Sequence, residues 1–158
     1  MQNRFDIIIV KTLKHEGGYV WRDDDPGGET NYGISKGSYP SIDIKNLTKA
    51  QAIEIYRRDY WEKPKINMIK DDDLAAKVFD IGVNVGTTRA VRFLQTAINF
   101  LGAKLATDGV LGPKTLSAVN GHSNPKAVLT VFKEQVRAHY LRQNKPQFIT
   151  GWLRRLDS

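Results

Sequence analysis

The chain has 158 residues, enough for one domain or for one domain with a small second part. Apolar residues make up 41% and charged residues 26%, a balance that supports a buried core and excludes a disordered chain. The sequence has no cysteine, so disulfides, thiolate metal sites and a cysteine nucleophile are excluded. The excess of 24 Lys and Arg over 17 Asp and Glu gives a net charge of +7. Such a charge favours a polyanionic partner, namely nucleic acid, an anionic membrane surface or an acidic cell-wall polymer.

The sequence shows neither a signal peptide nor a membrane-spanning segment. The apolar run at residues 7–10 ends at Lys11 and is too short for the centre of a signal peptide. No stretch approaches the ~20 apolar residues that a transmembrane helix needs. We therefore expect synthesis in the cytoplasm without a signal peptide and no integral membrane association. A target outside the cytoplasm would then require a holin or a dedicated export machinery.

Helices and one hairpin are expected in the first part of the chain. Apolar residues recur at helical spacing over residues 3–15, and two glycines then end the helix. Turn residues rich in Gly, Pro and Asp predict a small antiparallel hairpin near residues 19–35. Thr48 and Gln51 have the spacing of a capping box, which predicts a helix that runs to about Glu62.

The remaining sequence is helical in pattern. Asp73 is expected to cap one helix, Gly86 to end it, and further helices follow at about 87–101, 113–119, 126–143 and 148–156. The total is about seven helices with one small β region, a mainly α fold of the α+β type. Polar residues near 65–73 suggest a division into residues 1–68 and 69–158, packed together, with one compact globule as the alternative.

Three motifs that resemble known sites are rejected. His15–Tyr19 begins like the zinc motif H-E-x-x-H, but tyrosine stands where the second histidine is needed. Gly33–Gly37 matches G-x-S-x-G without the buried strand that a nucleophile elbow requires. The acidic runs Asp23–Asp25 and Asp71–Asp73 lack the alternating ligands of a calcium loop. We therefore expect no metal and no cofactor.

Two carboxylates near the first helix form a candidate catalytic pair. Glu16 ends an apolar helix, where partial burial would favour the protonated form of a general acid. Asp25 follows in a polar turn, where it would stay ionised, and the Thr30 hydroxyl could help it to hold a water molecule. On spacing alone, a surface glutamate at a helix end and an ordinary turn aspartate remain the alternative.

The residue sequence around these two carboxylates is more specific than the spacing between them. Residues 15–19 read H-E-G-G-Y and residues 25–35 read D-P-G-G-E-T-N-Y-G-I-S. Both closely resemble the family 108 glycoside hydrolases, phage-endolysin-like N-acetylmuramidases of the lysozyme superfamily. The resemblance implies a lysozyme-like helical fold and a catalytic acid at Glu16. By likeness to phage-type lysozymes it also implies roles for Asp25 and Thr30, with inversion at the sugar; Asp23 and Asp24 compete for the aspartate role.

The second half carries a resemblance of its own. Residues 79–95, the D-G-V-L-G-P-K-T segment at 108–115 and the G-W-L segment at 151–153 look like the peptidoglycan-binding domain that follows the catalytic part in this family. The resemblance thus implies a muramidase part at 1–68 and a peptidoglycan-binding part at 69–158. The partner would be the glycan strands of peptidoglycan in the periplasm or cell wall, to which the positive charge would help to hold the enzyme.

Substrate contacts and alternatives complete the hypothesis. Tyr19 and Tyr32 flank the acid in sequence and could stack on sugar rings, while Asn84 could contact substrate or simply cap a helix. We expect a monomer that hydrolyses the β-1,4 bond between N-acetylmuramic acid and N-acetylglucosamine and binds no nucleic acid. The alternatives are a lytic transglycosylase that uses Glu16 alone and a non-catalytic cell-wall-binding module.

Overall fold

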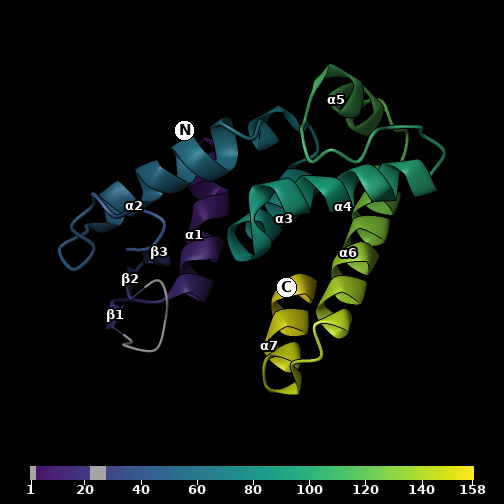
Figure 1. Cartoon of the computed structure of the whole chain (residues 1–158). Coiled ribbons are helices and arrows are strands. Elements are labelled where there is room, and N and C mark those ends of the chain that lie inside the picture. The colour runs from purple at the N-terminus through teal and green to yellow at the C-terminus, as the bar shows by residue number, and fades with distance from the viewer. Residues whose placement is uncertain (1–2, 22–27) are drawn as a thin grey trace. The chain divides into compact units, whose positions relative to one another are not determined.

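The structure is a computed structural model that describes residues 3–21 and 28–158. The chain forms two compact units, Met1–Arg58 and Asp59–Ser158. In the described residues there are seven α-helices and one three-stranded antiparallel sheet (Figure 1). The prediction of a mainly α fold with a small β region is therefore confirmed.

The first unit begins with helix α1, Arg4–Glu16. The Asn3 side chain starts the helix by accepting a 3.0 Å hydrogen bond from the backbone N–H of Asp6. The helix ends at Gly17, whose positive φ of 69° is a conformation that favours glycine. The buried stripe of α1, at helical spacing, consists of Phe5, Ile9 and Thr12.

The sheet lies in the region that was predicted to form a hairpin, near residues 19–35. Its strands are β1 (Val20–Trp21), β2 (Glu29–Asn31) and β3 (Ile34–Ser35), paired antiparallel in that order. The central strand places Thr30 opposite Val20 on one side and Ser35 on the other. The sheet is short, so it relies on the rest of the unit for its stability.

A two-residue turn joins β2 to β3. Its central residues, Tyr32 and Gly33, have φ values of 52° and 79°, and a type I′ hairpin turn requires positive φ at both positions. Just before the turn, the buried Asn31 amide donates a 3.1 Å hydrogen bond to the Ile44 carbonyl oxygen. The turn is therefore held to the loop that precedes α2.

Helix α2, Lys49–Tyr56, begins with the predicted capping box. Thr48 Oγ1 accepts from the Gln51 N–H at 3.2 Å, and Gln51 Oε1 accepts from the Thr48 N–H at 2.9 Å. The helix continues to the predicted end, but as the π-helix η1, Arg57–Glu62. Arg57, the first residue of η1, contacts α1, since its guanidinium lies 3.3 Å from Asp6 Oδ1 and 4.6 Å from the centre of the Phe5 ring.

The second unit is a helical bundle. Helices α3 and α4 pack together, α6 contacts both, and α7 packs against α6 (Figure 1). Its core includes large, fully buried side chains from three of these helices, such as Phe79, Leu94 and Phe132. Over residues 3–21 and 28–158, no helix is both long and apolar enough to span a bilayer. The elements are η2 (Ile66–Met68), α3 (Asp72–Val85), α4 (Thr87–Phe100), α5 (Pro113–Asn120), α6 (Pro125–Arg142) and α7 (Pro146–Asp157).

One predicted cap is wrong. Asp71, not Asp73, caps α3, because its side chain accepts from the Leu74 N–H at 2.9 Å. Three consecutive aspartates offer three similar caps, and the first of them satisfies the N–H that is free one turn later. The predicted break at Gly86 is confirmed by its position between α3 and α4.

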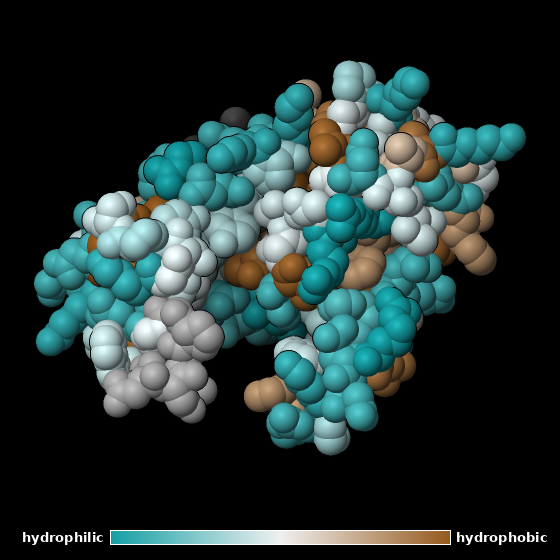
Figure 2. Space-filling view, in the orientation of Figure 1, coloured by the Kyte–Doolittle hydropathy of each residue, from teal (hydrophilic) through white to brown (hydrophobic). Residues whose placement is uncertain are grey.

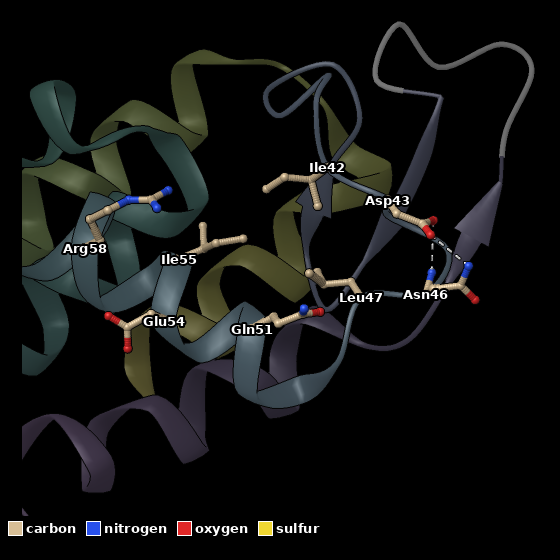
Figure 3. A pocket seen from close by; sticks show the side chains of 8 residues that line it. All are labelled: Ile42, Asp43, Asn46, Leu47, Gln51, Glu54, Ile55 and Arg58. Carbon is tan, nitrogen blue, oxygen red and sulfur yellow. Dashed lines mark hydrogen bonds between the residues drawn. The ribbon is translucent and has the colours of Figure 1, made fainter.

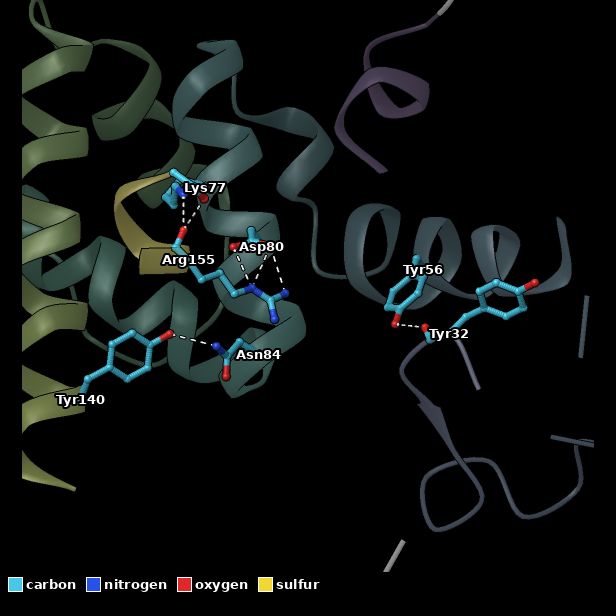
Figure 4. A network of polar contacts seen from close by, with 8 residues as sticks. Tyr32, Tyr56, Lys77, Asp80, Asn84, Tyr140 and Arg155 are labelled. Atoms are coloured by element: carbon cyan, nitrogen blue, oxygen red, sulfur yellow. Dashed lines mark hydrogen bonds and ion pairs between the residues drawn. The ribbon is translucent and has the colours of Figure 1, made fainter. Parts of the chain in front are cut away.

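Buried polar groups fasten the last helix to α3. The Arg155 guanidinium of α7 contacts the Asp80 carboxylate of α3 at 3.0 Å, and both side chains are largely buried (Figure 4). Lys77 donates a 3.2 Å hydrogen bond to the Arg155 carbonyl oxygen. The chain end is therefore anchored by charge-assisted hydrogen bonds as well as by apolar contact.

Candidate active site

Glu16, the predicted acid, is the last residue of α1 and is half-buried. The turn between β2 and β3 lies directly against it. A Cβ atom placed on Gly33 would stand 2.7 Å from Glu16 Oε2 and 2.9 Å from Glu16 Cβ. Only a glycine lets the turn come this close to the glutamate without displacing it.

Helix α2 brings a third group to the same place. The Cβ position on Gly33 also overlaps the hydroxyl of Tyr56. That hydroxyl donates a 2.6 Å hydrogen bond to the Tyr32 carbonyl oxygen, and the Tyr56 side chain is buried (Figure 4). Glu16 is thus positioned by α1, by the glycine turn and by a tyrosine that holds this turn.

Sequence reasoning missed the role of Tyr56. It fits the apolar pattern of α2, so the sequence indicates a core residue and nothing more. Its ring does fill the core, while its hydroxyl is the group that reaches the turn. The hydroxyl of a buried tyrosine usually needs a hydrogen-bond partner. This requirement is the one feature of the sequence that could have indicated a polar role for Tyr56.

A hollow of about 330 Å³ opens beside the end of α1. Tyr32 and the two glycines that follow Glu16 form part of its wall. Lys14 and Lys49 add two positive charges, so the hollow suits a neutral or anionic ligand. Its remaining lining residues are Val10 and Leu13.

Tyr19, a predicted sugar contact, lies near the start of the sheet and is 41% exposed. Its hydroxyl donates a 2.8 Å hydrogen bond to Glu29 Oε2. This hydrogen bond raises the pKa of the Tyr19 phenol above its ordinary value. The ring is therefore fixed at its hydroxyl end while much of it stays open to solvent.

The other predicted catalytic groups belong to the sheet region. Thr30 is the middle residue of β2 and is half-buried, and side-chain alternation places it on the face opposite Glu29 and Asn31. Asp25 lies outside the described residues, as do its competitors Asp23 and Asp24. The catalytic roles of Glu16, Asp25 and Thr30 therefore stay predictions.

Asn84, the third predicted substrate contact, belongs to the second unit. It lies in the last turn of α3, where its amide donates a 3.0 Å hydrogen bond to the Tyr140 hydroxyl (Figure 4). Burial raises the pKa of Tyr140 to about 12, so its hydroxyl stays protonated at neutral pH. Asn84 does not cap α3, and its contact with substrate stays a prediction.

A second hollow in the first unit, of about 390 Å³, has a different character (Figure 3). Ile42, Leu47 and Ile55 form its apolar part. At one end the Asn46 amide donates a 2.9 Å hydrogen bond to Asp43 Oδ2. None of the predicted site residues lines it. The hollow at the end of α1 is the better candidate for the active site, because Tyr32 and the two residues that follow Glu16 line it.

Comparison with known proteins identifies the domains of the chain. Residues 9–86 match the family model Glycosyl hydrolase 108, and residues 89–157 match the model Predicted Peptidoglycan domain. The solved structure titled "Structure of Brucella abortus SagA" is similar over 97% of this chain and 89% of that chain, with 28% identity and a TM-score of 0.79. No curated protein sequence gives a significant match.

The protein is therefore a glycoside hydrolase. In particular, it combines a glycosyl hydrolase 108 domain with a predicted peptidoglycan domain, as the sequence motifs implied, and this pairing indicates a peptidoglycan hydrolase. The two matches meet between residues 86 and 89, whereas the compact units meet at 58 and 59. Helix α3 thus falls within the hydrolase match although it packs in the helical second unit.

Proposed function

We propose that the protein is an N-acetylmuramidase that hydrolyses the β-1,4 bond between N-acetylmuramic acid and N-acetylglucosamine in the cell wall. The observation that carries the proposal is the placement of Glu16. Glu16 is half-buried at a helix end and lies against Gly33. The two residues that follow it, Gly17 and Gly18, line a hollow that also presents Tyr32 and two lysines. A general acid for glycosidic cleavage needs such a fixed position at the border of a substrate site.

In the proposed reaction, Glu16 donates its proton to the glycosidic oxygen as the bond to the anomeric carbon breaks. Asp25, aided by the Thr30 hydroxyl, takes a proton from a water molecule whose oxygen forms the new bond to that carbon. The leaving sugar gains one hydrogen and the other sugar gains one hydroxyl, so one water is consumed. Attack from the opposite face inverts the anomeric centre.

The hollow beside α1 would hold the glycan near the acid. Tyr32 offers an aromatic ring to a sugar face, and Tyr19 offers a second, partly exposed ring. Lys14 and Lys49 would attract the carboxylates that muramic acid and its peptides carry. These interactions fit an acidic glycan better than a neutral one.

The decisive experiment compares Glu16→Gln with Glu62→Gln. Glu62 is exposed, so its variant changes the net charge equally without touching the hollow. We expect Glu16→Gln to stop the release of soluble fragments from purified sacculi while its unfolding transition stays intact. Full activity in Glu16→Gln would refute the assignment of Glu16 as the acid, whereas no release of fragments by the unchanged protein would refute the proposed function.

Two further measurements separate hydrolysis from transglycosylation. Product masses decide first, because a lytic transglycosylase leaves anhydromuramyl ends that are lighter by one water than hydrolysed ends. Asp25→Asn should then abolish hydrolysis, whereas Asp23→Asn and Asp24→Asn should not. An active Asp25→Asn variant with anhydro products would replace the muramidase proposal by a transglycosylase that uses Glu16 alone.

A further inference from the structure

The loop between α4 and α5 is fixed in shape by two side chains of α4. Gln95 is fully buried, and its amide nitrogen donates to Asp108 Oδ1 at 2.9 Å and to the Val110 carbonyl oxygen at 3.0 Å. Asn99 holds the other part of the loop through both the N–H and the carbonyl oxygen of Leu105, at 2.7 and 2.9 Å. The loop is thus organised before any ligand arrives.

Gly109 completes this arrangement. Its N–H donates a 2.9 Å hydrogen bond to Gln95 Oε1, and its φ of 77° lies in the region that favours glycine. A Cβ atom here would stand 2.5 Å from Thr88 Cγ2 and 2.8 Å from the Thr88 carbonyl oxygen. The D-G-V-L-G-P-K-T segment therefore encodes a rigid, close-packed loop as well as the start of α5.

The loop borders a hollow of about 450 Å³ in the second unit. Its apolar part comes from Leu105, Ala106, Val110 and Pro113, and Val110 is 61% exposed although its backbone is held in place. In the space-filling view, hydrophobic patches lie among hydrophilic side chains over the α5 region (Figure 2). An apolar surface that is rigid and yet exposed is a common feature of binding sites.

Charged groups surround this apolar part. Lys104 and Lys114 line the hollow, and within residues 3–21 and 28–158 neither has an ion-pair partner. Asp108 also lines it and stays ionised, because the hydrogen bond from Gln95 and then that from the Val110 N–H lower its pKa. The hollow therefore presents two cations and one anion around aliphatic side chains.

We propose that this hollow binds the stem peptide of peptidoglycan, with Lys104 and Lys114 pairing with its carboxylates and the aliphatic wall contacting its alkyl groups. Sugar faces usually stack on aromatic rings. The described lining residues of this hollow include no aromatic ring, whereas Tyr32 lines the hollow at the end of α1. The hollow at the end of α1 would thus bind the glycan strand, and the hollow beside α5 would bind the stem peptide. This inference rests on the proposed function, because it assumes that peptidoglycan is the substrate.

The test uses the full chain with Glu16→Gln, so that no ligand is cleaved during the titration. The probes are a soluble disaccharide muropeptide that keeps its stem peptide and the same disaccharide without the peptide. Lys104→Ala/Lys114→Ala is compared with Lys126→Ala/Lys145→Ala, whose exposed lysines lie outside the hollow and whose loss lowers the net charge equally. Affinity is measured by fluorescence titration, and the backbone amide signals of Gly109 and Val110 are followed by NMR.

We expect the peptide-bearing probe to shift both amide signals and to bind about tenfold more weakly, or worse, to the Lys104/Lys114 variant than to the control. The disaccharide without peptide should leave these signals unchanged. Equal affinity in the two double variants, or equal shifts with the peptide-free disaccharide, would overturn the peptide site. Because hydrolysis of sacculi by the unchanged enzyme is measured separately, such a result would leave the muramidase proposal standing.

Discussion

Gly33 lies so close to Glu16 that a side chain would not fit between them, since a Cβ on Gly33 would stand 2.7 Å from Glu16 Oε2. The contact joins the end of α1 to a turn seventeen positions later in the sequence. The hairpin thereby sets where the acid points. Gly33 has no reactive group, yet it is therefore expected to control the position of the predicted acid, Glu16.

Gly33→Ala should reduce sacculus hydrolysis about tenfold or more, because the new methyl group must displace Glu16 or Tyr56. The positive φ also opposes alanine and should lower the free energy of unfolding by about 1–2 kcal/mol. Gly102→Ala is the matched control, since φ is positive there too but its Cβ position is open. Similar activity in both variants would mean that the contact does not position the acid.

Tyr56→Phe should lower kcat more than it changes KM. The variant removes the 2.6 Å hydrogen bond to the Tyr32 carbonyl oxygen and frees the turn that contacts Glu16. The loss of one such bond should cost about 1 kcal/mol in the free energy of unfolding. Steady-state kinetics and urea unfolding are measured together. A stability loss with unchanged kcat would show that Tyr56 supports the fold without positioning the acid.

Asn84→Ala and Tyr140→Phe separate two roles of the Asn84 amide. Both variants remove the 3.0 Å hydrogen bond between these side chains, so both should lose stability to a similar degree. If Asn84 contacts substrate as predicted, Asn84→Ala alone should raise KM for sacculi. The same KM in both variants would limit Asn84 to its structural contact with Tyr140.

Asp80→Asn should destabilise the second unit strongly. It leaves the largely buried Arg155 guanidinium without its carboxylate, a change that typically costs about 3–5 kcal/mol. Asp157→Asn removes the same charge from the exposed pair with Arg137, at 2.8 Å, and should cost less than about 1 kcal/mol. Urea unfolding compares the two variants. Equal losses would show that burial of the Asp80–Arg155 pair adds nothing to its effect.

Tyr140 should make the protein lose stability at alkaline pH. Burial raises its pKa from 10.0 to about 12 in the folded chain, so its stabilising contribution is fully present below pH 10. Between pH 10 and 12 the unfolded chain releases the phenol proton while the folded chain retains it. Stability should therefore fall by up to about 1.4 kcal/mol per pH unit in this range. Tyr140→Phe should show a shallower fall in unfolding experiments at pH 8–11.5, and an equal slope would contradict this origin.

The sequence by itself determined the local structure and the kind of chemistry. Caps such as Thr48 with Gln51 act within one helical turn, so their spacing identifies the start of α2 directly. The end of α1 and the turn before β3 were likewise readable from glycines and apolar periodicity. The E-G-G-Y and D-P-G-G-E-T segments pointed to a family 108 hydrolase, in agreement with the family match.

Only the tertiary structure decided which distant groups meet. Tyr56 reaches the Tyr32 carbonyl from 24 positions away, and Arg155 reaches Asp80 from 75 positions away. Sequence periodicity assigns both Tyr56 and Asp80 to helices, but it does not say which turn or helix each will contact. Such contacts depend on how whole elements pack, because burial and hydrogen-bond satisfaction are met by the assembled core rather than by neighbours in the chain.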